Sequence, residues 1–206
     1  MVKYFTQVTN CDHMEEFPVK LNVIIGSTRP SRRGPLVGRW FADLAGQQGR
    51  FEVELVDLAE YRLPLLDEAE HPRLQRYEHA HTKRWSASVA AADAYVFVTP
   101  EYDYFPPATL VNAIQVLARE WAYKPAGFVS YGGISGGLRA AQQLRLLISS
   151  LSVYPLPQVV PLPQFEQYLD DAGVFRPTKP VVDGAVGMLD ELHKWAVALE
   201  TMRKPG

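Results

Sequence analysis

Apolar runs and amphipathic stretches alternate along most of the chain. The apolar runs are short, rich in β-branched residues and closed by turn residues, as in strands buried on both faces of a sheet. They predict strands at 21–26, 51–58, 94–99, 125–132 and 156–163. Strands separated by helices predict an α/β fold, with right-handed crossovers and a parallel sheet covered on both faces.

The stretches between the strands carry apolar residues at helical spacings. In the first, Val37, Phe41 and Leu44 share one face, and Pro35 suits the first turn of a helix. Helices are predicted at 35–48, 73–92, 108–120, 138–151 and 182–203. Prolines bound the last predicted strand and place it at an edge of the sheet.

Residues 1–20 are polar and show neither the alternation of a strand nor the spacing of an amphipathic helix. We interpret them as a flexible N-terminal extension of one domain that covers 21–206. They lack the apolar core of a signal peptide. Elsewhere, no apolar run approaches the roughly 18–20 residues of a membrane span, so the sequence predicts no membrane partner.

The composition is that of an ordinary globular protein, with 47% hydrophobic and 21% charged residues in a chain of 206. The net charge of −2 lacks the basic excess of a nucleic-acid-binding protein, so no nucleic-acid partner is expected. A single cysteine, Cys11, cannot form an internal disulfide and supports no metal cluster. The expected compartment is therefore a reducing cytoplasm.

Candidate chemistry begins with "GSTRPSRRGP" (26–35), where the first strand gives way to the first helix. Backbone N–H groups and the helix dipole favour an anion here, and Arg29, Arg32 and Arg33 supply positive charge. The loop matches neither G-x-x-x-x-G-K-[ST] nor G-x-G-x-x-G. The predicted ligand of this loop is a terminal phosphate. The alternative is a polar turn with solvated arginines and no ligand.

Two further loops follow the third and fourth predicted strands. "PEYDYFPPATLVNAI" (100–114) places prolines and tyrosines where a flat ring could lie over backbone amides. "SYGGISGGLRA" (130–140) carries glycines that permit positive φ and close approach of a ligand. Each alone is also compatible with a stiff or tight turn. Together with the first loop they predict one crevice at the carboxyl ends of the strands.

Four motifs occur in a specific order: G-S-x-R at 26–29, P-E-Y at 100–102, L-x-N-A-I at 110–114, and YGG…GG from Tyr131. In these motifs the chain resembles the NADPH-dependent FMN reductase family of flavodoxin-like proteins, over about residues 21–160. The resemblance implies a three-layer sandwich with a five-stranded parallel sheet of order 2-1-3-4-5 and FMN as cofactor.

The resemblance also implies which residues hold FMN. Its phosphate-binding positions fall on Ser27, Thr28, Arg29, Arg33, Gly34 and Pro35. Its ring-binding positions fall on Pro100, Glu101, Tyr102, Asp103, Tyr131, Gly132, Gly133 and Ser135. Asp103 replaces a common Asn, Phe105 a common Ser and Val111 a common Lys. An ionised Asp103 beside the ring would oppose negative charge on reduced flavin.

The implied activity is that of an NAD(P)H-dependent FMN reductase or quinone reductase. The flavin takes hydride at N5 from NADPH or NADH and passes electrons to a small acceptor, a quinone, an azo compound or a flavin. No catalytic side chain or metal is then needed. No second dinucleotide motif is visible, which predicts one shared site and ping-pong kinetics. The alternatives are a flavodoxin-like electron carrier, which stronger acidity would favour, and a non-catalytic FMN-binding or interaction module.

The remaining side chains of interest have plainer interpretations. His71, His79 and His81 lack a persuasive metal-binding spacing and are expected on a solvated helix face. Similar reductases cover the exposed flavin with a second subunit, so a homodimer or a dimer of dimers is predicted. Its interface would use the third and fourth helices and the segment 119–125. The aromatic residues expected in the core or at an interface are Trp40, Trp85 and Trp195.

Overall fold

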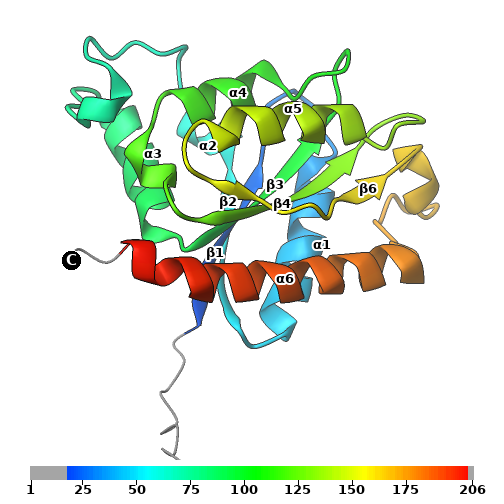
Figure 1. Cartoon of the computed structure of the whole chain (residues 1–206). Helices are drawn as coiled ribbons and strands as arrows, with labels where there is room; N and C mark the ends of the chain where they lie inside the picture. The colour runs from blue at the N-terminus through cyan, green and yellow to red at the C-terminus, as the bar shows by residue number, and fades with distance from the viewer. Residues whose placement is uncertain (1–17, 204–206) are drawn as a thin grey trace, which may run out of the picture.

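A parallel sheet of six strands lies at the centre of the computed structural model, which describes residues 18–203 (Figure 1). The strands are β1 (Val19–Ile25), β2 (Phe51–Asp57), β3 (Ala94–Pro100), β4 (Pro125–Tyr131), β5 (Tyr154–Pro155) and β6 (Val160–Leu162). The order is β2-β1-β3-β4-β5, and β6 also pairs with β4. The predicted flavodoxin-like order 2-1-3-4-5 is confirmed, with a sixth strand added.

The predicted strand at 156–163 is wrong in its bounds, because two short strands share this edge of the sheet. β5 pairs with the start of β4, and β6 pairs with its end. Between them the Arg145 guanidinium of α5 (Leu138–Ser149) donates hydrogen bonds to the carbonyl oxygens of residues 156–158. Pro157, which has no N–H, lies in this break. The hydrogen-bond ladder along this side of β4 is therefore interrupted where the Arg145 side chain occupies the carbonyl oxygens.

Helices cover both faces of the sheet. Besides α5, they are α1 (Gly34–Gln47), α2 (Leu58–Tyr61), α3 (Ala80–Ala91), α4 (Ala108–Gln115) and α6 (Lys179–Arg203), with 3₁₀ turns η1 (Pro72–Leu74), η2 (Arg119–Trp121) and η3 (Phe165–Tyr168). α1 and α6 bury Phe41 and Met188 against one face. α3, α4 and α5 bury Trp85, Ile114 and Leu144 against the other (Figure 1).

The predicted helix at 73–92 begins later, at Ala80. Gln75 lies in the left-handed region with φ of 54°, which interrupts any helix through it. The Glu68 carboxylate instead accepts hydrogen bonds from the N–H groups of Glu78 and His79, at 2.7 and 3.1 Å. It satisfies donors at the amino end of α3 and so fixes where the helix starts.

The predicted helix at 108–120 is also shorter, since α4 ends at Gln115 and η2 follows. The segment 119–125, expected at an interface, is largely internal. Trp121 is fully buried and Lys124 is only 5% exposed. The Trp121 ring packs edge-on against Trp85, with their centroids 5.9 Å apart. Trp121 and Lys124 therefore belong to the core, whereas Arg119 and Tyr123 remain exposed, so the interface stays a prediction.

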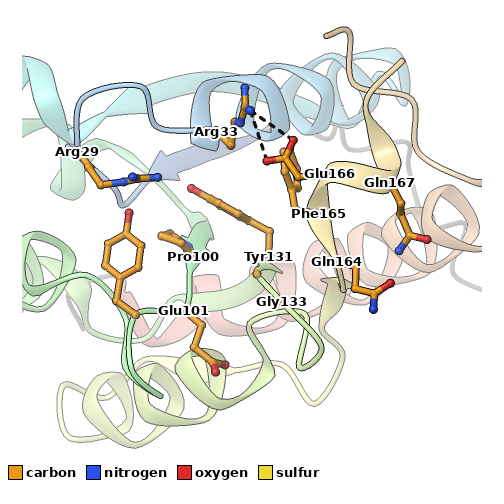
Figure 2. Close-up of a pocket in the computed structure, with 12 residues that line it drawn as sticks. Arg29, Arg33, Pro100, Glu101, Tyr131, Gly133, Gln164, Phe165, Glu166 and Gln167 are labelled. Carbon is orange, nitrogen blue, oxygen red and sulfur yellow. Dashed lines mark hydrogen bonds and ion pairs between the residues drawn. The ribbon is translucent and has the colours of Figure 1, made fainter. Parts of the chain in front are cut away.

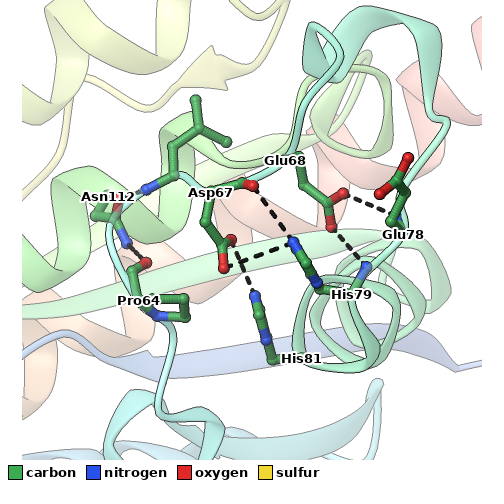
Figure 3. A network of polar contacts seen from close by, with 8 residues as sticks. Pro64, Asp67, Glu68, Glu78, His79, His81 and Asn112 are labelled. Atoms are coloured by element: carbon green, nitrogen blue, oxygen red, sulfur yellow. Dashed lines mark hydrogen bonds and ion pairs between the residues drawn. The ribbon is translucent and has the colours of Figure 1, made fainter.

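The segment from 62 to 79 is tied to α4 by the asparagine of the L-x-N-A-I motif (Figure 3). The Asn112 amide nitrogen donates to the Pro64 carbonyl at 2.7 Å, and its oxygen accepts from the Leu66 N–H at 3.0 Å. A side chain that satisfies two backbone groups of a loop holds it as a strand partner would. Asn112 therefore has a structural role.

The clustered histidines are organised around one acid. His79 and His81 stack with centroids 5.2 Å apart, and Nε2 of His81 lies 3.1 Å from a carboxylate oxygen of Asp67 (Figure 3). His71 instead accepts a hydrogen bond from the Arg73 N–H at 3.1 Å. Within residues 18–203, no group of three or more His, Cys, Asp or Glu side chains has an arrangement that could hold a metal ion.

β1 begins at Val19, two residues inside the predicted extension. Residues 1–17, with Cys11, lie outside the described residues, so the flexible extension stays a prediction. In the described range, none of the helices combines the length and apolarity that crossing a membrane requires.

Candidate functional site

A cavity of about 550 Å³ opens at the carboxyl ends of the strands (Figure 2). It draws on the loops that follow β1, β3, β4 and β6, as the rule for open parallel sheets predicts. Its lining residues are Arg29, Arg33, Pro100, Glu101, Tyr102, Tyr131, Gly132, Gly133, Gln164, Phe165, Glu166 and Gln167. The first three loops were predicted to converge here, and they do.

The three arginines of the first loop have different partners. Arg32 forms an ion pair with Asp57 at the end of β2, at 2.5 Å. Arg33 reaches Glu166 across the mouth of the cavity, at 3.3 Å (Figure 2). Arg29 is exposed, and within the described part of the chain its guanidinium pairs with no acidic side chain. Arg29 therefore carries the charge that is most available to an anionic ligand.

Two tyrosine hydroxyls reach back from the second and third loops to the first. The Tyr102 hydroxyl lies 2.8 Å from the hydroxyl of Ser27, which is fully buried. The Tyr131 hydroxyl lies against Gly34 at the start of α1, where a Cβ placed on the glycine would be 3.2 Å from it. Burial, and then the nearby Tyr102, raise the pKa of Tyr131, although Arg29 lowers it in part. Its phenol is therefore protonated at neutral pH.

The Glu101 carboxylate, 7% exposed, joins the second loop to the start of α5. It accepts from the Ser135 hydroxyl at 2.9 Å and from the Arg139 N–H at 3.1 Å, and it pairs with the Arg139 guanidinium at 2.6 Å. Burial would raise the pKa of Glu101, but these hydrogen bonds and the charge of Arg139 outweigh it and hold the pKa below its ordinary value. Glu101 is therefore an ionised structural anchor.

Residues 102–105 form a tight hairpin at the cavity rim. The N–H groups of Tyr102 and Phe105 donate to each other's carbonyl oxygens, at 2.8 and 2.9 Å. Asp103 and Tyr104 both have positive φ, 49° and 74°, as a type I′ turn requires. Asp tolerates this conformation better than most residues, which suits it to position 103. Asp103 is exposed and does not line the cavity.

The glycine-rich turn that follows β4 requires glycine most strictly at position 137. Gly137 has φ of 79°, and a Cβ placed on it would lie 2.7 Å from the Tyr131 backbone nitrogen. The turn can therefore fold close against the end of β4 only with glycine there. Nothing lies within 4 Å of a Cβ placed on Gly133, so this side of the cavity is open.

Four predicted phosphate residues lie off the main cavity, and the first of them, Ser27, is fully buried. Thr28 lines a separate cavity of about 250 Å³ together with Arg62 and Thr109. Gly34 is buried behind Tyr131, and Pro35 follows it as the second residue of α1.

Sequence reasoning missed the fourth wall, residues 164–167. They follow β6 at the same carboxyl edge as the other loops, and that position was the available signal.

Comparison with known proteins decides the family. The model of the NADPH-dependent FMN reductase family matches residues 19–167, more than half of the chain. The chain belongs to this family. An NAD(P)H-dependent FMN reductase from Nectria sp is 33% identical over 186 residues, which cover 87% of this chain and 88% of the relative. The family predicted from the four motifs is therefore confirmed.

Other relatives match over shorter segments. An NAD(P)H-dependent FMN reductase of Schizosaccharomyces pombe is 41% identical over 125 residues, 60% of this chain and 62% of the relative. A quinone reductase of Pseudomonas putida is 34% identical over 130 residues, 60% of this chain and 66% of the relative. The chain therefore aligns with less than two thirds of the first of these two proteins.

The fold agrees with this membership. The flavoenzyme NAD(P)H:(acceptor) oxidoreductase FerB from Paracoccus denitrificans superposes with a TM-score of 0.69 at 21% identity. The superposition covers 87% of this chain and 98% of FerB. At this identity the likeness concerns the flavodoxin-like fold alone.

The cavity of this FMN reductase family member has a volume and lining residues that suit FMN. Its volume lies within the roughly 300–1,000 Å³ typical of ligand sites. An unpaired guanidinium, Arg29, and two tyrosine hydroxyls gather at one end, where an anion would be held. Pro100 and the open backbone at Gly133 also line the cavity, where a flat ring could lie. The residues present therefore suit a phosphate joined to an aromatic ring system.

Proposed function

We propose that this protein is an NAD(P)H-dependent FMN-containing oxidoreductase that passes electrons to a small acceptor, foremost a quinone. The carrying observation is the cavity itself, whose lining combines the unpaired Arg29 with Pro100, two tyrosines and two glycines. Family membership supports FMN as cofactor and NAD(P)H as donor. The quinone reductase relative supports the acceptor class.

The side chains of the site bind and position, and none acts as a catalytic acid or nucleophile. FMN, when bound, supplies the redox chemistry by accepting hydride and releasing electrons. Arg29 would attract and hold the phosphate. The Glu101–Arg139 pair fixes the hairpin at the rim relative to α5, so the surface that receives the ring is set before binding. Prepositioning of this kind is the contribution expected of a flavoprotein scaffold.

One open cavity supports a ping-pong order of reaction. The donor and the acceptor would use the same open side of the cavity in turn, near Gly133. We expect parallel lines in double-reciprocal plots of rate against NADPH at several concentrations of 1,4-benzoquinone. Intersecting lines would require a complex that holds donor and acceptor together, and would rule out the shared site.

We further propose a homodimer or a dimer of dimers, with the cavity rim in the interface. Large apolar side chains are exposed around it: Tyr104 is 59%, Phe105 56% and Ile134 86% exposed. Such a cluster is typical of an interaction surface. Light scattering at micromolar concentration should show an assembly, and Ile134→Glu should dissociate it. A wild-type monomer would refute the proposal.

The activity is tested by absorbance under anaerobic conditions. The purified protein should show a flavin spectrum, lose its visible absorbance on addition of NADPH or NADH, and regain it when 1,4-benzoquinone follows. A flavin spectrum that neither nicotinamide bleaches would favour the electron carrier. No flavin binding even after reconstitution with FMN would favour an interaction module.

A further inference from the structure

The amino end of α1 offers fewer amide donors than a phosphate-binding helix usually does. Pro35 has no N–H, and the Leu36 N–H already donates to the Arg33 carbonyl at 3.0 Å. The Tyr131 hydroxyl lies against Gly34, the first residue of the helix. An anion at this end of α1 therefore meets a phenol where backbone amides are expected.

Tyr131 is held firmly in this position. Its backbone pairs with Pro100 in the sheet, its side chain belongs to a residue only 6% exposed, and its ring packs on Phe165 at 5.4 Å between centroids. Figure 2 shows the ring extending from β4 toward Arg29. A Cβ placed on Gly34 would lie 3.2 Å from the hydroxyl, so glycine at position 34 leaves room for it. The phenol is a fixed part of the cavity wall.

We propose that the Tyr131 hydroxyl belongs to the phosphate end of the cavity and donates a hydrogen bond to the FMN phosphate there. This differs from the resemblance, which places Tyr131 against the isoalloxazine ring. Tyr131 lines the cavity and its hydroxyl is directed toward Arg29 (Figure 2), so its O–H can donate to an anion held there. The inference rests on FMN being the cofactor, as proposed above.

The protonation state agrees with this role. Burial raises the pKa of Tyr131, so at neutral pH the group is a phenol and donates its proton in a hydrogen bond. It adds no charge to the site. Its loss should therefore weaken phosphate binding without removing the attraction that Arg29 exerts.

The test compares FMN with riboflavin, which lacks the phosphate, in the wild type and in Tyr131→Phe. Flavin fluorescence quenching gives both dissociation constants. We expect the value for FMN to rise about tenfold, as for loss of one charge-assisted hydrogen bond, and the value for riboflavin to change less than about twofold. Inorganic phosphate should compete with FMN less well in the variant than in the wild type.

Tyr168→Phe is the matched control. Tyr168 is equally buried, at 6% exposure, in the same apolar cluster, but it does not line the cavity. It should leave both dissociation constants unchanged. Thermal melting of all three proteins separates a binding effect from a folding effect.

Equal losses for FMN and riboflavin in Tyr131→Phe would overturn the inference and restore Tyr131 to the ring. No loss for either flavin would overturn it too, and would leave the hydroxyl as a partner of α1 alone.

The outcome is distinguishable from that of the proposed function. If the wild type binds FMN but is not bleached by NAD(P)H, the function fails while the ratio of FMN to riboflavin affinity still decides the inference. If the wild type binds no FMN, calorimetric titration of inorganic phosphate decides it: weaker binding to Tyr131→Phe supports the phosphate subsite, and equal binding refutes it.

Discussion

The two edges of the sheet use their positive charges differently. At the amino edge a hollow of about 650 Å³ is lined by Lys124 and Arg203. The Lys124 ammonium donates to the Val89 and Ala90 carbonyls, at 2.9 and 3.1 Å, and Arg203 pairs with Asp93 at 3.0 Å. At the carboxyl edge the smaller cavity keeps Arg29 unpaired by any acid among the described residues.

Volume therefore does not distinguish the two hollows. They differ in whether their positively charged side chains already have hydrogen-bond or ion-pair partners. A buried ammonium must be hydrogen-bonded, and Lys124 meets this need by capping the carbonyl end of α3. A solvated guanidinium has no such need, so leaving Arg29 unpaired costs the fold little and keeps it for a ligand. The contrast assigns stability to the amino edge and binding to the carboxyl edge.

The largest expected effect concerns Arg29. Arg29→Ala should weaken FMN binding by about 1.5–3 kcal/mol, the scale of hydrogen bonds to charged groups, and leave riboflavin binding nearly unchanged. Arg32→Ala, from the same loop, is the control because its charge is already paired with Asp57. Fluorescence titration with both flavins measures the effect. Equal losses for FMN and riboflavin would break the contrast by making the loop a structural element.

The sheet could be predicted from the sequence more fully than the contacts between its loops. The strand order and the convergence of Arg29, Glu101 and Gly133 on one cavity follow from motifs and from the geometry of parallel sheets. The late start of α3 does not, because it depends on Glu68 reaching the backbone of residues 78 and 79 from a separate segment.

The same limit applies to the walls of the cavity. The Tyr131 hydroxyl could not be placed at Gly34 from the sequence, since the contact joins β4 to α1 across β3. The contribution of residues 164–167 depended on a strand that proline splits in two. Contacts between loops of different strands are the part that local patterns do not encode.

A second, smaller effect is expected at Glu101, an acid of the carboxyl edge whose charge is fully paired. Glu101→Gln should lower the free energy of unfolding at pH 7 by about 1–2 kcal/mol, because hydrogen bonds to a charged acceptor are weakened. The pKa of Glu101 is lowered in the fold, so this stabilisation is present above the pKa of the unfolded chain. It is lost as the pH falls through the folded value.

Urea unfolding of both proteins at pH 7 and at pH 3 measures this difference, which should shrink at the lower pH. The variant Glu60→Gln, with an exposed helical carboxylate whose side chain has no ion pair among residues 18–203, is the control. A difference that is constant with pH would show that the charge of Glu101 is not what anchors the hairpin.

The next prediction concerns Lys124 at the amino edge of the sheet. Burial lowers the pKa of Lys124 to about 8, so the folded chain releases this proton before the unfolded chain does. The wild type should therefore gain stability as the pH rises from about 8 toward the ordinary lysine value near 10.4. Lys124→Met should lack this gain and should be less stable by about 1 kcal/mol at pH 7, since two carbonyls lose a donor.

Denaturant titrations at pH 7, 8.5 and 9.5 follow both proteins, and FMN affinity is measured alongside. The affinity should be unchanged in Lys124→Met, because the substitution lies at the opposite edge of the sheet. A variant that keeps its stability but loses FMN would invert the assignment of the two edges.

The smallest effect is expected at Asp103, where the sequence suggested the largest departure from the family. This residue has a backbone role in the structure, because it holds φ of 49° at the hairpin tip while its side chain lies outside the cavity lining. Asn tolerates the same conformation. Asp103→Asn should therefore change the free energy of unfolding by less than about 0.5 kcal/mol, as most surface substitutions do.

The same substitution also tests whether Asp103 influences the flavin. An exposed carboxylate acts on a ring only through solvent, which screens it, so we expect the flavin reduction potential to shift by less than about 20 mV. Asp103→Val is the contrasting variant, because a β-branched residue is strained at positive φ and should destabilise the hairpin. Spectroelectrochemistry and melting curves report the two quantities. A large positive shift of the potential in Asp103→Asn would show that charge at the rim reaches the ring, and the carboxyl edge would then tune the cofactor as well as bind it.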